Sequence, residues 1–316
     1  MPASRDHHYV SQFYLKHFAA DRRDPWLFTF DIPTRKTFMS RPQNVAFEKD
    51  FHTINAPGQP PDIVETELAK LESDVAPALD RVVENLRFAS ATDREHILFF
   101  LTMLLIKSPA MRKTVDDFTN EIMNLVGKME AQDREVFYAK VRQHIAEGAM
   151  PPDTNIERLR QSVLGSDFTI GLSTEAHLHL AFSVLPQLYG ECVAPRHWNI
   201  LRATEGQFVT SDRPVVALWS DENKTDPVGL GLGGSRILFP LSSTVAINGG
   251  FELEDCALEI GAEDVAKING RIILGVKRQI YARDDGFEYL LRYHPGRTPG
   301  AKLLQDERAI VAIAEN

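Results

Sequence analysis

The most constraining feature of the sequence is the run ILFFLTMLLI at residues 97–106, in which nine of ten residues are apolar. A helix that crosses a bilayer needs about twenty such residues, so this run is too short to span a membrane. A helix that is apolar on every side must be enclosed by other elements of a folded protein. The run therefore predicts a central buried helix.

Around this run, the spacing of apolar residues changes twice along the chain. Residues 26–54 contain two strand-like runs rich in Phe, Thr and Val, separated by Pro-Thr-Arg-Lys, which predicts a β-hairpin. Apolar residues at helical spacing dominate the middle of the chain, and from about residue 196 short β-forming runs separated by turns take over. We expect an α+β fold: a mainly helical body, a β-rich C-terminal third and an N-terminal β-hairpin packed onto it.

The length of 316 residues allows one large domain or two of ordinary size. We found no internal repeat and no low-complexity tract, so we expect a single compact unit over residues 1–316. Within it, residues 1–60 form the N-terminal segment and hairpin, residues 61–195 are helical, and residues 196–316 are β-rich with one helix.

Charge and cysteine content exclude several classes of protein. There are 35 basic and 44 acidic residues, a net charge of −9, which argues against broad nonspecific binding to nucleic acid or to an anionic membrane. The two cysteines, Cys192 and Cys256, do not form a CxxC pair, so no zinc ribbon or thioredoxin motif is present. Few cysteines and an N-terminus without an apolar signal-peptide region predict a soluble cytoplasmic protein.

The densest polar segment is DHHYVSQFYLKHF at residues 6–18. Ser11 is a suitable N-cap for a short helix from Gln12 to about Phe18, which an apolar face would anchor. His7 and His8 precede the helix in extended chain, so their side chains should point to opposite sides. Either the segment is a docked plug whose histidines bond to backbone groups, or these residues take part in a site.

Two further clusters are candidates for chemistry. Glu65 and Glu72 are seven residues apart and share the edge of one helix, where carboxylates can bind metal, orient a base or form a salt bridge, the last being the commonest outcome. Ser211, Asp212 and Arg213 precede a proline at the end of a strand-like run. They form either a plain Asx turn or a group presented to a cleft.

Several of these motifs together resemble a family catalogued as domain of unknown function 4238. The resemblance is carried by HHYVSQFYLKHFA, PQNVAFEKDFHTI, VETELAKLE, KSPAMR, FVTSDRPVV and FPLSS, and it extends over nearly the whole chain. The sequence departs from the family pattern at Ser11 (usually Pro), Lys107 (usually Arg) and Arg213 (usually Asn). A lysine cannot reproduce a bidentate arginine contact. The resemblance implies an organisation of the chain and no activity.

Common catalytic motifs are missing from the sequence. There is no HExxH zinc motif, no P-loop lysine after the glycines of residues 229–234, and no GxSxG elbow. His177 and His179 are two residues apart in a predicted helix, about 200° around its axis, and cannot chelate one metal ion there.

We therefore hypothesise an enzyme whose site joins the two ends of the chain, with hydrolysis of a polar or phosphorylated substrate as the favoured reaction. The assigned catalytic residues are His8, Lys107 and Asp212. The assigned substrate-binding residues are His7, Gln12, Ser211 and Arg213. Glu65 and Glu72 are the candidate ligands of a divalent metal cofactor. The alternative is a non-enzymatic partner-binding module of a bacterial stress or defence locus, in which these groups form a structural network.

Overall fold

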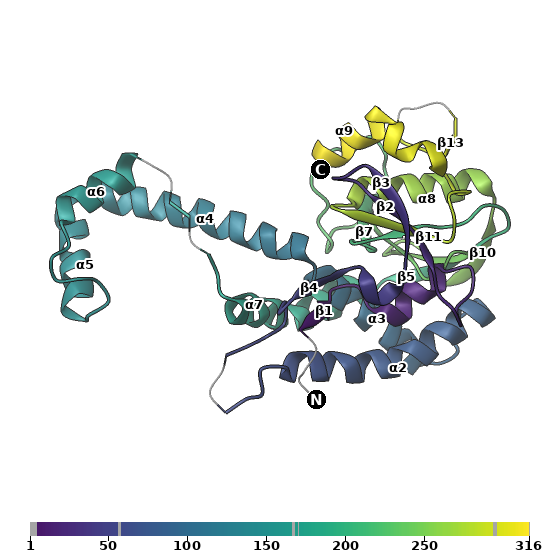
Figure 1. Cartoon of the computed structure of the whole chain (residues 1–316), viewed down its shortest axis with the longest axis horizontal. Coiled ribbons are helices and arrows are strands. Elements are labelled where there is room, and N and C mark those ends of the chain that lie inside the picture. Colours follow the sequence, from purple (N-terminus) through teal and green to yellow (C-terminus); the bar gives the residue numbers. More distant parts are fainter. Residues whose placement is uncertain (1–4, 56–57, 166–167, 170, 293–295, 316) are drawn as a thin grey trace. The chain divides into compact units, whose positions relative to one another are not determined.

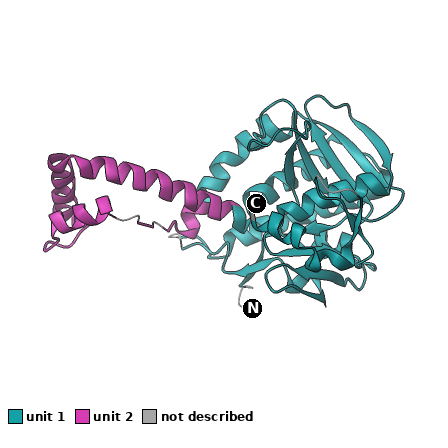
Figure 2. Cartoon of the chain, turned by 90° about the horizontal axis from the view of Figure 1, so that it is seen from above, with its two compact units in different colours: residues 1–110, 178–316 teal, residues 111–177 magenta. Residues whose placement is uncertain are grey.

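The computed structural model describes residues 5–55, 58–165, 168–169, 171–292 and 296–315. It contains helices and sheets, which confirms the α+β class. The sequence predicted one compact unit, whereas the Cα positions group into two: residues 1–110 with 178–316, and residues 111–177 (Figure 2). The first unit contains every residue that the sequence assigned to the site.

The N-terminal segment of the first unit is short but deeply buried. It comprises strand β1 (Asp6–His8), helix α1 (Gln12–Leu15) and one 3₁₀ turn (Lys16–Phe18). Tyr14 and Phe18 are completely buried, as the predicted apolar face requires. The predicted cap differs, because the Ser11 side chain does not bond to the backbone of α1.

The predicted hairpin is present as β2 (Leu27–Asp31) and β3 (Lys36–Ser40), an antiparallel pair. The hairpin was expected to pack on helices, but in the structure it is part of a larger sheet. β2 also pairs with β11 (Gln279–Ala282), which pairs in turn with β6 (Thr210–Ser211), giving a sheet in the order β3-β2-β11-β6. The reason is that four of the five residues of β2 are buried, so its second edge and both its faces need partners inside the protein.

A five-stranded sheet forms the centre of the first unit. Its order is β10 (Cys256–Ile260), β5 (His197–Ala203), β9 (Val245–Gly250), β8 (Ser235–Pro240) and β7 (Val216–Trp219). Only the β10–β5 pair is parallel. Side chains alternate between the two faces. One face joins the core shared with α1, α2 and α3, and the other joins the core shared with α8 (Ala262–Gly275) (Figure 1).

Two helices cover the first face of this sheet, α2 (Ile63–Asn85) and α3 (Ala91–Ile106). The N-cap of α3 is Ser90, whose hydroxyl accepts the N–H of Asp93 at 3.0 Å. Most of the run at residues 97–106 is buried, which confirms the predicted central helix.

The remaining elements are divided between the two units. In the second unit, parts of α4 (Pro109–Gln132), α5 (Arg134–Ala146) and α6 (Ile156–Gly165) enclose a small apolar cluster around Phe137. The other described elements are α7 (Thr174–Gln187), a π-helical turn (Leu188–Val193), a 3₁₀ turn (Pro42–Asn44), β4 (Phe47–Lys49), the pair β12 (Glu288–Tyr289) and β13 (Thr298–Pro299), a 3₁₀ helix (Gly300–Gln305) and α9 (Glu307–Glu315). Among the described residues, no helix combines the length and apolarity needed to cross a bilayer.

Replacing Leu101 by aspartate should prevent folding. The side chain is fully buried in α3. Burying an unpaired carboxylate there costs more free energy than the total free energy of unfolding of a typical protein. We expect the Leu101→Asp variant to be insoluble or to unfold without a cooperative transition, as followed by circular dichroism. Thr92→Asp, an exposed change in the first turn of the same helix, should melt like the unmodified protein. A cooperatively folded Leu101→Asp variant would contradict the buried position.

Removing the Tyr14 hydroxyl should lower the free energy of unfolding by about 1–3 kcal/mol. That hydroxyl lies 2.7 Å from Oγ1 of Thr210 and donates to the carbonyl oxygen of Pro240 at 2.8 Å, so Tyr14→Phe leaves two buried polar groups without it. Urea denaturation measures the loss. The double variant Tyr14→Phe/Thr210→Val should lose less than the sum of the two single changes, because one pair of partners is removed together. If the losses in unfolding free energy of the two single variants add up to that of the double variant, the contact between Tyr14 and Thr210 contributes nothing to stability.

His17 should make the protein less stable as the pH falls. Burial first, and then the charge of Arg22, lower its pKa to about 4, although Asp80 lies 3.3 Å away and acts in the opposite direction. The unfolded chain therefore takes up this proton near pH 6.5 and the folded chain only near pH 4. The stabilisation is complete above pH 6.5 and about 3 kcal/mol of it is lost by pH 4. Urea titrations should show this loss in the unmodified protein and in His197→Gln, an exposed control, but not in His17→Gln. Equal losses in all three proteins would rule out the assignment to His17.

Candidate functional site

Strand β1 places its two histidines on opposite sides, as predicted. It pairs with β4 so that His7 lies opposite Glu48 and His8 opposite Phe47. His7 is 1% exposed, whereas His8 is partly exposed and its ring lies 5.5 Å from that of Phe47. The pairing with β4 matters for the site because it brings the chain that follows β4 next to His7.

That following chain delivers His52, a residue that sequence reasoning did not single out. Asp50 adopts a left-handed backbone conformation (φ 56°) that turns the chain after β4. The backbone N–H of His52 then donates to Nδ1 of His7 at 2.8 Å, and the two rings stack with centroids 5.6 Å apart and planes 9° apart. Because Nδ1 of His7 accepts this bond, a neutral His7 carries its proton on Nε2.

Glu65 completes this group from the first turn of α2. Its Oε2 lies 2.8 Å from Nδ1 of His52, so Nδ1 carries the proton of a neutral His52 ring and the lone pair is on Nε2. Burial raises the pKa of Glu65, but the hydrogen bond with His52 and the nearby positive charges, including Lys107, outweigh it and hold the pKa below its usual value. Glu65 is therefore an anion whose charge is directed at the His52 ring. A helix N-terminus favours that charge.

A second polar group consists of Ser11, which precedes α1, Glu72, two turns further along α2 than Glu65, and Lys107. The Ser11 hydroxyl donates to Oε1 of Glu72, and Nζ of Lys107 lies 3.8 Å from the same oxygen. Lys107 is the C-cap of α3 and also donates to the carbonyl oxygen of His8 at 3.3 Å. Burial lowers the pKa of Lys107, while Glu72 and Glu65 act in the opposite direction. Glu72 therefore forms an ion pair, which is the commoner outcome for a glutamate at the edge of a helix.

His8 and Gln12 line the partly exposed side of this region. Nε2 of Gln12 lies 3.4 Å from Nδ1 of His8. Burial lowers the pKa of His8 more than Glu65 raises it, and Lys107 lowers it further. His8 is therefore neutral at physiological pH, because the loss of hydration destabilises the protonated ring more than the charge of Glu65 stabilises it.

Asp212 and its neighbours have a different environment. The Asp212 carboxylate accepts the backbone N–H groups of Lys277 at 3.1 Å and Arg278 at 2.6 Å, and Oγ of Ser211 accepts the N–H of Arg213 at 3.1 Å. Burial raises the pKa of Asp212 to about 6, against the effect of those backbone donors. Burial first, and then the charge of Asp212, raise the pKa of Tyr9, the neighbour of His8. The proximity of His8, Gln12 and Asp212 around one pocket stays a prediction.

A candidate metal set emerges from the first group. One potential ligand atom from each of His7, His52 and Glu65 lies within 4.8 Å of the others. Two imidazoles and a carboxylate are the protein ligands of many catalytic zinc and iron(II) sites. Glu72, which the sequence paired with Glu65 as a ligand, is not part of the set. The hydrogen bond from His52 to Nδ1 of His7 opposes coordination, because Nε2 of His7 can bind a metal ion only if the ring proton moves to Nδ1.

His52 could have been suspected from one signal in the sequence. It follows Lys49-Asp50-Phe51 within PQNVAFEKDFHTI, a segment that the family resemblance had already marked. What the sequence could not supply is the β1–β4 pairing, which joins residues about forty positions apart. Without that pairing, nothing in the sequence connects this histidine to His7.

Comparisons with known proteins agree with the motifs. A family model described as "Protein of unknown function (DUF4238)" matches residues 6–286, a span that contains all the residues of the candidate site. The comparison with curated proteins found no match, and the comparison with solved structures found none either.

Proposed function

Because the chain belongs to this family of proteins of unknown function, we propose its activity from its own residues: hydrolysis of a polar or phosphorylated substrate, with His52 as general base and Glu65 as the group that orients it. The observation that carries the proposal is the 2.8 Å contact between Nδ1 of His52 and Oε2 of Glu65. A base held by a carboxylate is a recurring arrangement in hydrolytic enzymes.

The chemistry follows from the tautomer of His52. A water molecule beside Nε2 would transfer a proton to that nitrogen while its oxygen attacks the carbonyl carbon or the phosphorus of the substrate. Glu65 would stabilise the resulting imidazolium, and the proton would then pass to the leaving group. Stacking on His7 restricts rotation of the His52 ring, so little entropy is lost when the transition state forms.

The surrounding residues supply binding groups. His8 and Gln12 are partly exposed next to this pair, and the buried charge of Lys107 acts on both His8 and Glu65. Nε2 of His52 is itself buried, so the proposal requires that water and substrate reach it from the partly exposed side of His8. Ser211, Asp212 and Arg213 are part of the proposal only if the predicted shared pocket exists.

A divalent metal ion at His7, His52 and Glu65 is the metal-assisted version of this proposal. It would lower the pKa of bound water and replace the general base. We favour the metal-free version because a metal ion would have to break the hydrogen bond between the His52 backbone and His7.

Activity assays on variants test the function. We expect turnover of a p-nitrophenyl ester, phosphomonoester or phosphodiester, and a fall in kcat of at least about 10²-fold in His52→Ala and in Glu65→Gln. His197→Ala, an exposed histidine of the same unit, is the matched control and should keep full activity. Melting temperatures of all three variants separate loss of chemistry from loss of fold. Folded variants with unchanged rates would rule out the dyad, and loss of activity on EDTA treatment, restored by Zn²⁺, would favour the metal-assisted version.

The second candidate is a partner-binding module, which we place in a bacterial cytoplasmic stress or defence locus. The observation that favours it is burial: His7, His52 and Lys107 are all covered. Hydrogen bonds to backbone groups, from the His52 N–H to His7 and from Lys107 to the His8 carbonyl, connect residues 7 and 8 to neighbouring segments. In that case His52→Ala would lower the melting temperature, and no substrate of the three classes would be turned over by the unmodified protein.

A further inference from the structure

The second face of the five-stranded sheet is only partly covered. α8 packs on Leu201, Leu238 and Ala246 of this face. The strand register places Asn248 and Arg236 on the same face, because Asn248 lies opposite Leu238 and Arg236 lies two residues before it. Beyond the reach of α8, these two polar side chains form the floor of an open cleft.

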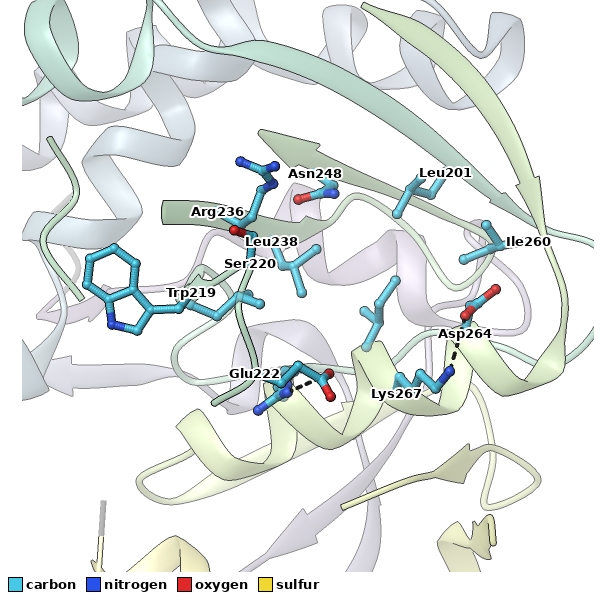
Figure 3. A pocket seen from close by; sticks show the side chains of 13 residues that line it. Leu201, Trp219, Ser220, Glu222, Arg236, Leu238, Asn248, Ile260, Asp264 and Lys267 are labelled. Atoms are coloured by element: carbon cyan, nitrogen blue, oxygen red, sulfur yellow. Dashed lines mark hydrogen bonds and ion pairs between the residues drawn. The ribbon is translucent and has the colours of Figure 1, made fainter. Parts of the chain in front are cut away.

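The cleft has a volume of about 360 Å³, within the usual range for small-molecule sites. Its base contains apolar side chains of the sheet and of α8, among them Leu201, Leu238 and Ile268. One wall is the exposed side of α8 with Asp264, Lys267 and Arg271. The other is the end of β7 and the residues after it, from Leu218 to Glu222 (Figure 3). An apolar base with a charged rim suits a ligand that has an apolar part and a charged group.

Two arginines that line the cleft, Arg236 and Arg271, are more buried than their carboxylate partners. Arg236 is 16% exposed and its partner Glu252 is 49% exposed, with 2.6 Å between them. Arg271 is 23% exposed and its partner Glu222 is 72% exposed, with 3.1 Å between them. Ion pairs with such exposed carboxylates contribute little free energy, so an anion in the cleft can replace them at small cost.

The floor of the cleft offers a polar group of its own. Oδ1 of Asn248 is buried, and among the described residues none donates a hydrogen bond to it. Buried amide atoms normally have a partner, so this one indicates a group that binds there. Beside it, Gly250 makes room for Arg236, because a Cβ at this glycine would lie 2.4 Å from Nη1 of that arginine.

We propose that this cleft binds a small organic anion with an apolar body. The anionic group lies between Arg236 and Arg271, the apolar body covers Leu201, Leu238 and Ile268, and a polar group of the ligand or of its bound water bonds to Asn248. The site is built from residues 201–271 and shares no residue with the His52–Glu65 pair, so it does not depend on the proposed hydrolytic activity.

Isothermal titration of the full chain with octanoate tests the proposal. Acetate carries the charge without the chain and octanol the chain without the charge, so both should bind at least about tenfold more weakly than octanoate. Arg236→Met and Arg271→Met should each weaken octanoate binding by about tenfold or more, the usual effect of losing a bond to a charged group. Arg202→Met is the matched control: it lies on the opposite face of the same sheet, pairs with an exposed glutamate, and should leave binding unchanged.

The outcomes separate the possibilities. Octanoate affinity that is equal in Arg236→Met, Arg271→Met and the control would overturn the proposal, and so would equal affinity for octanoate and octanol. Arg271 is on the surface of α8, so its variant carries the test if Arg236→Met fails to fold. His52→Ala should bind octanoate normally, and a loss there would show that the two sites are not separate.

Discussion

The hydroxyl of Tyr14 connects the beginning of the chain to the strands that follow residue 200. It bonds to Thr210 and to the carbonyl of Pro240, while the ring stacks on Phe239 with centroids 5.2 Å apart. Phe100 of α3 lies against both rings. The N-terminal segment is therefore a part of the core and not a surface attachment. The positions of His7, His8 and Ser11 are as rigid as that core, which is what a catalytic or binding group requires.

Burial of charge explains how the groups around this segment are arranged. Lys107 and Asp212 are buried and Glu65 is partly buried. Each has specific partners: carboxylates and a carbonyl for the lysine, an imidazole for the glutamate, two backbone N–H groups for the aspartate. The results differ because the partners differ. Neighbouring charges keep Glu65 ionised, whereas neutral backbone donors leave Asp212 with a pKa of about 6. Glu65 is therefore an anion at neutral pH and can stabilise an imidazolium at His52.

Local patterns in the sequence predicted the elements that depend on local physics. The apolar run at residues 97–106, the hairpin, and the opposite orientations of His7 and His8 were all predictable from side-chain periodicity. The pairing of β2 with β11 and of β1 with β4 could not be predicted, because the sequence of a strand does not identify a partner strand that is far away along the chain. Ser11 is a second example, for a single side chain. Serine is a residue type that favours the N-cap of a helix, but in the structure the Ser11 hydroxyl donates to the carboxylate of Glu72 instead. The Asp212 turn was predicted as a local motif, and in the structure its carboxylate binds a segment 65 residues away.

The choice between a general base and a metal centre depends on a single proton. In a neutral imidazole one nitrogen donates and the other accepts, so the backbone N–H of His52 at Nδ1 of His7 places the proton of His7 on Nε2. A metal ion needs that lone pair and must shift the proton or displace the backbone. His52 is different, since its Nδ1–H faces Glu65 and its lone pair is on Nε2. Of the two stacked rings, His52 is therefore suited to accept a proton and His7 to donate one. This division of roles, set by one backbone bond and one carboxylate, favours acid–base chemistry at this site over metal coordination.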